Sequence, residues 1–279
     1  MLAWSESDLT TTLSFSDRLV RAWTVSDSLV CVGLDPDMSK LPARFANASQ
    51  PIFAFNKEII DATHDLVCAY KPQIAFYSAV GAERQLEATI GYIRDRAPNA
   101  IVILDSKRGD VGNTATAYAA EAFERYRADA VTINPYLGED SVRPFVKDAA
   151  HAAIVLCRTS NSGARDFQDL LVDGKPLYQH VAQRAARDWN QLKNVLFVVG
   201  ATYPEEMATL RKAHPEITFL VPGIGAQGGD LKAALDNGLD AQKQGLLISS
   251  SRQIIFAGEQ AAISKAAQQL RDDINALRY

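Results

Sequence analysis

The sequence has few of the features that mark secreted, membrane-spanning or zinc-binding proteins. Its 279 residues include only three cysteines, Cys31, Cys68 and Cys157, which lie far apart and each within an apolar run. Three scattered cysteines are too few for a disulfide framework, and no two of them have the spacing of metal ligands. We expect buried thiols that pack as small apolar side chains.

Long hydrophobic stretches are also missing. No apolar run approaches the ~18 residues that a membrane-spanning helix needs. The N-terminal segment MLAWSESDLTTTLSF has no basic region followed by an apolar one, as a secretory signal would. These absences predict a cytoplasmic protein with no membrane partner.

Charge of one sign does not accumulate anywhere along the chain. The 29 basic and 33 acidic side chains are interspersed and leave a net charge of −4, so no basic surface favours a nucleic-acid partner. Hydrophobic residues make up 47% and charged residues 22%, which is the composition of a globular protein that can bury a large core.

The chain does contain a regular alternation of two kinds of segment. Eight short apolar runs are mostly continuous rather than alternating, which is typical of parallel strands covered on both faces. They occupy residues 28–35, 66–72, 100–107, 130–135, 152–159, 194–200, 217–223 and 245–251. Amphipathic helical patterns lie between them, among them residues 78–97, 114–126, 178–192 and 205–215, and another follows the eighth run.

This alternation predicts an α/β protein with the architecture of a (β/α)8 TIM barrel. A doubly wound open sheet is the alternative, although it usually has fewer strands. No linker or low-complexity tract divides the chain, so we expect residues 1–279 to form a single barrel domain. Residues 1–25 are expected to be an N-terminal extension, in which SFSDRLVRAW has the apolar spacing of a short helix.

In such a barrel, the side chains that do chemistry lie at the C-terminal ends of the strands. The third run ends in LDSKRGD, in which Asp105 and Lys107 are two residues apart and therefore face the same side of an extended strand. Lys71 ends the second run, and Asp110 follows the third run in a loop. These four charges can converge at one rim of the barrel.

Two interpretations of this charged cluster are open. A salt-bridge network that ties neighbouring strand ends together is the common reason for such a pattern. However, three of the charges end buried strands, where an unpaired ion is costly. Charges kept at such places often belong to active sites with perturbed ionisation. We therefore favour the functional interpretation.

A second feature suits an anion. The glycine-rich segment VPGIGAQGGD (221–230) leads from the seventh run into a helix and can offer backbone N–H groups to a phosphate. Arg252 follows the eighth run and can pair with a phosphate in bidentate fashion. The glycines alone serve a turn equally well, but with Arg252 on the neighbouring strand a phosphate site is favoured.

Several segments resemble one enzyme family in order and spacing. ILDSKRGDVGNTA is similar to the active-site signature D-x-K-x-x-D-[IV]-x-x-T of the orotidine 5′-phosphate decarboxylases, in particular of their longer bacterial subgroup (type 2). Further matching segments are VGLDPD (32–37), AYKPQIAFY (69–77), TINPYLG (132–138), CRTSNSGA (157–164), VPGIGAQGG (221–229) and SSSRQIIFA (249–257). The resemblance extends over nearly the whole predicted barrel.

The resemblance implies an enzyme of pyrimidine biosynthesis. Such a carbon–carbon lyase converts orotidine 5′-phosphate to UMP and CO2 without a metal or an organic cofactor. In this chain Lys107 would protonate C6 of the pyrimidine as CO2 leaves. Asp105 would lie against the substrate carboxylate, and Lys71 would orient and neutralise Asp105.

The resemblance also implies the residues that bind the nucleotide. Asp35 would accept a hydrogen bond from a ribose hydroxyl, Ser160 would read the pyrimidine amide edge, and Gln227 would close over the phosphate and base. The chain would act as a homodimer with shared active sites. Asp110 and Thr114 would reach into the neighbour's site, with Thr114 near the ribose.

Two other functions remain open. A sugar-phosphate decarboxylase or aldolase of the same superfamily shares D-x-K-x-x-D but binds Mg²⁺ through a further carboxylate near the end of the second strand. Residues 71–82 contain no acid, which disfavours this enzyme. A catalytically silent nucleotide-binding barrel would keep the phosphate loop, but the presence of all four charges disfavours it.

Overall fold

The computed structural model describes residues 13–224 and 228–279, and it confirms the predicted TIM barrel. Eight parallel strands close in the order β1-β10-β9-β8-β5-β4-β3-β2, so the open doubly wound sheet is excluded. The strands are β1 (Val30–Leu34), β2 (Ala69–Pro72), β3 (Ile101–Arg108), β4 (Ala130–Ile133), β5 (Ala152–Arg158), β8 (Val195–Val199), β9 (Phe219–Pro222) and β10 (Leu246–Ser250).

Each barrel strand overlaps one of the eight predicted runs because it is buried on both faces. All residues of β1, β8 and β10 are buried. One face of such a strand fills the barrel and the other packs against helices, so the sequence reads as a continuous apolar run. The end of β3 differs: Ser106 and Arg108 are half-buried and Lys107 is exposed where the strand emerges at the rim.

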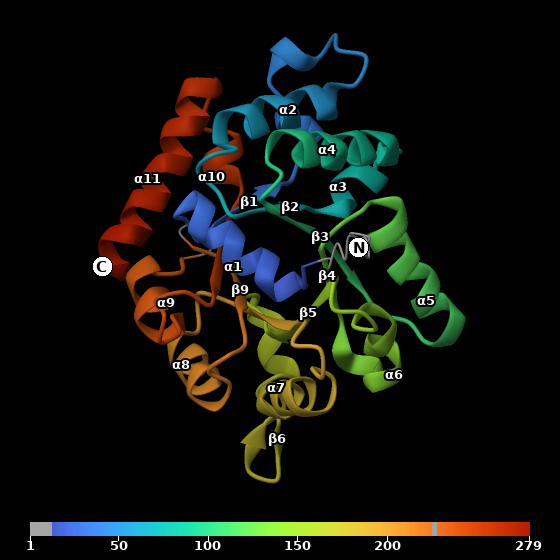
Figure 1. The fold of residues 1–279 in the computed structure, drawn as a ribbon, viewed down its shortest axis with the longest axis vertical. Coiled ribbons are helices and arrows are strands. Elements are labelled where there is room, and N and C mark those ends of the chain that lie inside the picture. Colours follow the sequence, from blue (N-terminus) through green and yellow to red (C-terminus); the bar gives the residue numbers. More distant parts are fainter. Residues whose placement is uncertain (1–12, 225–227) are drawn as a thin grey trace, which may run out of the picture.

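Helices surround the barrel, as Figure 1 shows. They are α2 (Pro51–Thr63), α3 (Ile74–Ser78), α4 (Glu83–Arg96), α5 (Gly112–Ala120), α6 (Glu139–Val142), α7 (Leu177–Asp188), α8 (Pro204–Ala213), α9 (Leu231–Gly238), α10 (Arg252–Ile255) and α11 (Gln260–Arg278). The helix predicted at 78–97 begins only at Glu83, because Gly81 takes a left-handed φ of 64° that interrupts it. In the described part of the chain, no helix is long and apolar enough to cross a membrane.

One helix lies at the N-terminal end of the barrel. α1 (Phe15–Ser26) confirms the predicted short helix and crosses the barrel in Figure 1. The Phe15 N–H donates to the carbonyl of Ala149 at 2.7 Å, and the Ser16 hydroxyl donates to the carbonyl of Lys193 at 2.7 Å. Both acceptors precede barrel strands, so α1 covers the end opposite the strand C-termini. Residues 1–12 lie outside the described ranges.

A small hairpin that we did not expect from the sequence follows β5. Its strands β6 (Leu171–Val172) and β7 (Lys175–Pro176) are antiparallel and flank Asp173 and Gly174, whose φ values are 49° and 76°. Asp-Gly is a favoured dipeptide for such a tight turn, so the sequence did contain a usable signal. The hairpin projects beyond α7 in Figure 1.

Candidate active site

A cavity of about 890 Å³ opens at the C-terminal ends of the barrel strands. Every barrel strand, or the loop that follows it, contributes to its wall, as expected for the active site of a TIM barrel. Its volume lies in the range of small-molecule sites. Of the predicted site residues, the cavity is lined by Asp35, Lys71, Asp105, Lys107, Ser160 and Arg252.

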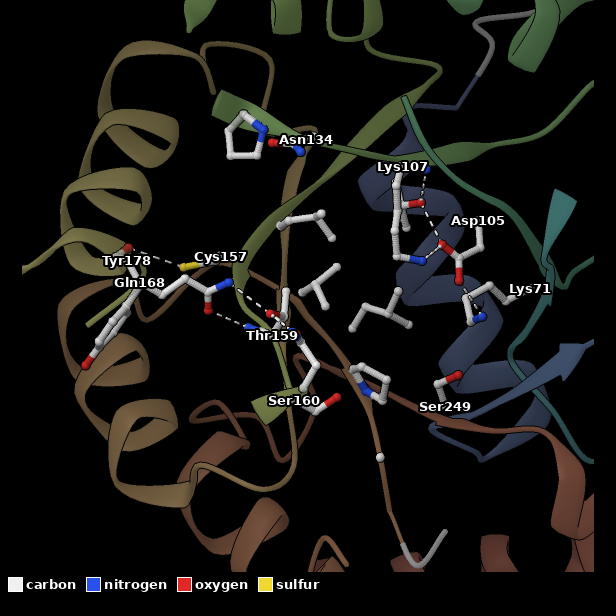
Figure 2. A pocket seen from close by; sticks show the side chains of 18 of the residues that line it. Lys71, Asp105, Lys107, Asn134, Cys157, Thr159, Ser160, Gln168, Tyr178 and Ser249 are labelled. Carbon is white, nitrogen blue, oxygen red and sulfur yellow. Dashed lines mark hydrogen bonds and ion pairs between the residues drawn. The ribbon is translucent and has the colours of Figure 1, made fainter. Parts of the chain in front are cut away.

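Two ammonium groups enclose one carboxylate in the wall of this cavity (Figure 2). The Lys71 Nζ lies 2.8 Å from Oδ2 of Asp105, and the Lys107 Nζ lies 2.6 Å from Oδ1 of the same carboxylate. The side chains of Lys71 and Asp105 are 8% and 9% exposed, whereas the Lys107 side chain is 49% exposed. Lys107 is therefore the member of the trio that is open to a ligand.

The trio fixes the charges of its two buried members. Burial by itself would raise the pKa of the Asp105 carboxyl, but the ammonium groups of Lys71 and Lys107 lower that pKa below its usual range. Burial would likewise lower the pKa of Lys71, but the carboxylates of Asp105 and Asp35 raise it above its ordinary value. Lys71 is thus a cation and Asp105 an anion at neutral pH.

The end of β3 reaches this geometry through an irregular backbone rather than the ideal alternation that we expected. Leu104 pairs with Val131 of β4, but Arg108 pairs with Ile133, so a bulge separates the two pairs. Within the bulge Lys107 has a left-handed φ of 48°, which is uncommon for a residue other than glycine. Bulges beside active sites re-aim side chains. Here the bulge turns the lysine towards the neighbouring carboxylate.

Asp35 and Ser160 occupy other parts of the wall. The Oδ1 of Asp35 is buried and has no hydrogen-bond partner within the described ranges. Such an oxygen is costly to leave unpaired, so a ligand hydroxyl that donates to it would stabilise the site. Ser160 packs closely against Gly200, where a Cβ would lie 2.7 Å from the Ser160 Cβ. The glycine therefore makes room for the segment that carries Ser160.

The glycine-rich loop and Arg252 lie at the same cavity. Gly223 has a φ of 101°, and its carbonyl accepts a hydrogen bond from the Gly229 N–H at 3.1 Å. A Cβ on Gly229 would lie 2.6 Å from the Cβ of Ala201, so only glycine fits there. Arg252 is exposed, and no acidic group of the described residues lies within ion-pair distance of it. The predicted phosphate-side residue Gln227 lies outside the described ranges.

Two predicted residues are not among the described residues that line the cavity. Asp110 is partly buried in the turn after β3, and its Oδ1 accepts a hydrogen bond from the Val111 N–H at 2.8 Å. Thr114 is exposed on α5 and lines a separate hollow of about 580 Å³. Within this chain the structure thus brings three of the four predicted charges together, and Asp110 stays apart from them.

We did not single out two polar residues that the structure places beside the site. The Thr132 side chain, at 1% exposure, donates a hydrogen bond to Asp105 at 2.8 Å. Arg158 is fully buried at the end of β5, where it pairs with Asp169 at 3.1 Å and stacks over the ring of Tyr203 at 3.8 Å. A charge that ends a buried strand was a usable signal for Arg158, whereas a threonine in a strand gives none.

Comparison with known proteins decides the family. The sequence model of the "Orotidine 5'-phosphate decarboxylase / HUMPS family" matches residues 28–267, which is most of the chain. The chain belongs to this family. The match confirms, at the level of the family, the resemblance that the motifs indicated.

Similar members of the orotidine 5′-phosphate decarboxylase family cover the chain almost completely. The orotidine 5′-phosphate decarboxylase of Cellvibrio japonicus is 56% identical over 272 residues, which are 95% of this chain and 100% of that protein. That of Cupriavidus taiwanensis is 51% identical over 271 residues, with 96% and 100% covered. The solved structure of Leishmania donovani OMP decarboxylase has a TM-score of 0.84 and 41% identity, and covers 95% of this chain and 99% of that one.

Proposed function

We propose that this chain decarboxylates orotidine 5′-phosphate to UMP and CO2, a step of pyrimidine biosynthesis. The observation that carries the proposal is the buried Asp105 carboxylate, held between two ammonium groups in the wall of a nucleotide-sized cavity. Membership of the family and 56% identity to a named orotidine 5′-phosphate decarboxylase support it.

The cluster suits a reaction that passes through a carbanion. When the bond from C6 to the carboxylate carbon breaks, the electron pair stays at C6 of the pyrimidine, where no adjacent carbonyl accepts it. The Lys107 ammonium stabilises this negative charge and then donates its proton to C6. The resulting neutral amine regains a proton from water. Because Lys107 is the exposed member of the trio, it is the one placed to approach a ligand.

Asp105 acts on the ground state of the substrate. A substrate carboxylate about 4 Å from it would be repelled by about 4 kcal/mol at an effective dielectric near 20. Loss of CO2 removes that repulsion, and the field of the lysines supplies the remaining stabilisation. Lys71 keeps Asp105 ionised for this task, because its buried ammonium lies 2.8 Å from the carboxylate.

Binding energy from the rest of the nucleotide supports the reaction. The phosphate lies between Arg252 and the glycine-rich loop, and the resemblance to the family assigns Gln227, which is outside the described residues, to the phosphate and base. The Oδ1 of Asp35, which has no hydrogen-bond partner within the described residues, accepts a hydrogen bond from a ribose hydroxyl. Ser160 reads the amide edge of the pyrimidine from the opposite wall of the cavity.

We further propose that the active form is a homodimer with shared sites. Asp110 and Thr114 follow β3 in the sequence but are not among the residues that line their own cavity, which supports a role in a neighbour's site. Val111, between them, is 47% exposed and apolar, as suits a surface that a second copy covers.

We place the enzyme in the cytoplasm. Cys31, Cys68 and Cys157 are free thiols, as is usual in a reducing compartment. Burial raises the pKa of the Cys31 thiol to about 12, which keeps that thiol protonated and unreactive.

The Mg²⁺-dependent enzymes of the superfamily are the alternative. Residues 71–82, at and after the end of β2, contain no acidic side chain that could supply their added carboxylate. We therefore propose that catalysis needs no metal or organic cofactor. Turnover that survives prolonged treatment with a chelator is expected, and its loss would favour the metal enzyme.

The direct test mixes the protein with orotidine 5′-phosphate and follows the loss of its ultraviolet absorbance. Lys107→Ala should lower kcat by about 10²–10⁴-fold or more and leave UMP binding largely intact. Lys193→Ala is the matched control, because Lys193 also has a positive φ, 56°, but lies at the opposite end of the barrel. An unchanged spectrum with the wild type would indicate a catalytically silent nucleotide-binding barrel. Full activity of Lys107→Ala would refute the proposal that Lys107 donates the proton to C6.

The shared site is tested by mixing two inactive variants. Asp110→Ala subunits and Lys107→Ala subunits should regain part of the activity on mixing, since some mixed dimers then contain one complete site. Verified mixed dimers that remain inactive would contradict the shared site and leave the proposed reaction standing.

A further inference from the structure

Thr132, at the end of β4, is bonded to the catalytic trio through a single hydroxyl group. Its Oγ1 accepts hydrogen bonds from the N–H groups of Ser106 and Lys107, each at 3.0 Å. The same oxygen donates to Oδ1 of Asp105 at 2.8 Å. The side chain is 1% exposed, so water does not compete for these bonds.

The bulge in β3 explains why a side chain makes these bonds. Residues 105–107 of β3 face Thr132 alone, because the flanking pairs are Leu104 with Val131 and Arg108 with Ile133. The N–H groups of Ser106 and Lys107 are therefore out of register with the carbonyl groups of β4. The Thr132 hydroxyl accepts their hydrogen bonds in place of a backbone carbonyl. Buried N–H groups need such a partner.

A count of protons shows which direction the hydroxyl must point. A hydroxyl has two lone pairs and one proton. Both lone pairs are used by the N–H groups of Ser106 and Lys107, so the proton can only be donated to the Asp105 carboxylate. With all three capacities used, Thr132 has none left for a substrate, although it borders the cavity.

We propose that Thr132 is a positioning residue that holds the Lys107 backbone in its left-handed conformation and sets the Asp105 carboxylate against it. The proposal rests on the function proposed above for Lys107 and Asp105. Lys107 has a φ of 48°, which a lysine rarely adopts without support. The one oxygen that accepts the Lys107 N–H also donates to the carboxylate that the Lys107 ammonium contacts at 2.6 Å. Removing it releases both partners together.

Three variants at this position separate the hydroxyl from the bulk of the side chain. Thr132→Val keeps the branched shape, whereas Thr132→Ser and Thr132→Ala differ from each other by the oxygen alone. A misplacement of the reacting group by 1 Å costs about 100-fold, so we expect kcat to fall by about that factor in the valine and alanine variants. The serine variant should stay close to the wild type.

Binding should respond differently from turnover, because Thr132 does not hold the nucleotide. KM for orotidine 5′-phosphate and the Kd for UMP should change by less than about threefold in all three variants. A merely structural role would lower kcat and affinity together. Thr63→Val is the matched control: Thr63 is fully buried and its hydroxyl donates to the Ile59 carbonyl at 2.7 Å, remote from the cavity. It should lose stability but keep its kcat.

A kcat of Thr132→Ala equal to that of Thr132→Ser would overturn the proposal, even if Thr132→Val fails to fold. A crystal structure of Thr132→Ala tests the positioning role of Thr132 without relying on activity. We expect the Lys107 backbone to leave the left-handed region and its ammonium to leave Asp105, and an unchanged trio would refute the inference. If the wild type fails to decarboxylate orotidine 5′-phosphate, the proposed function fails, but this structural arm still tests the role of Thr132.

Discussion

Replacing Lys71 by methionine removes one ammonium group from the buried trio and leaves Asp105 with Lys107 alone. Methionine retains most of the aliphatic volume of lysine, so the change is mainly one of charge. At the observed 2.8 Å the attraction between the two charges is about 6 kcal/mol at an effective dielectric of 20. Desolvation offsets part of this attraction, and losing one partner of a buried pair costs about 3–5 kcal/mol net. At about 2 °C per kcal/mol, the apparent Tm should fall by about 6–10 °C.

The assay is thermal or urea unfolding followed by circular dichroism, without nucleotide. Lys57→Met is a sharp control, because the Lys57–Asp61 pair has the same 2.8 Å separation but a lysine that is 48% exposed. An exposed pair of this kind contributes about 0.3–0.5 kcal/mol. Equal shifts for the two variants would refute the reasoning, since they would show that burial does not make the Lys71 pair stronger.

Three further predictions concern the pH dependence of stability, the glycine-rich loop and the end of β5. The ammonium groups of Lys71 and Lys107 hold the pKa of Asp105 below the ordinary value of about 3.9. The stabilisation is therefore complete above that ordinary value and is lost as the pH falls through the lowered pKa, so the stability advantage of the wild type over Asp105→Asn should shrink at acidic pH. Gly229→Ala should raise KM for orotidine 5′-phosphate, because the added Cβ has no room. Gly91 lies in helix α4, where an added Cβ would meet nothing within 4 Å, so Gly91→Ala should leave stability unchanged or raise it by up to about 1 kcal/mol. Arg158→Leu should raise KM for orotidine 5′-phosphate more than it lowers kcat. Arg165→Leu, whose side chain is 71% exposed, should change neither KM nor kcat.

The barrel could be predicted from the sequence because burial on both faces leaves an unmistakable pattern. The run that contains β1 is apolar from Leu29 to Leu34 except for glycine, and every one of these residues is buried. The same reasoning located Lys71 and Asp105, since a charge that follows such a run must lie at the strand end. The apolar pattern does not determine the register in which β3 pairs with β4, so the bulge between Leu104 and Arg108 was not foreseen.

Thr132 shows why part of the site could not be predicted from the sequence. A threonine in a buried strand is ordinary, because its branched side chain packs well against a sheet. Its importance arises only when the β3 bulge places two unpaired N–H groups opposite it. Asp110 shows the opposite case. Its spacing from Asp105 and Lys107 is easy to recognise in the sequence, but within one chain it is not among the residues that line the cavity with the trio.

A second buried carboxylate tests which feature actually distinguishes the site. Asp129 is 4% exposed, pairs with Arg18 and with Arg94, and accepts a hydrogen bond from the Val102 N–H at 2.7 Å. It is thus as buried as Asp105 and also lies between two cations. However, it precedes β4, at the end of the barrel that α1 covers, and its oxygens are used in holding strands and helices together. Burial and ion pairing alone therefore do not mark catalysis. The distinguishing feature of Asp105 is that its charge lies at a strand C-terminus, beside a cavity and a lysine that remains accessible.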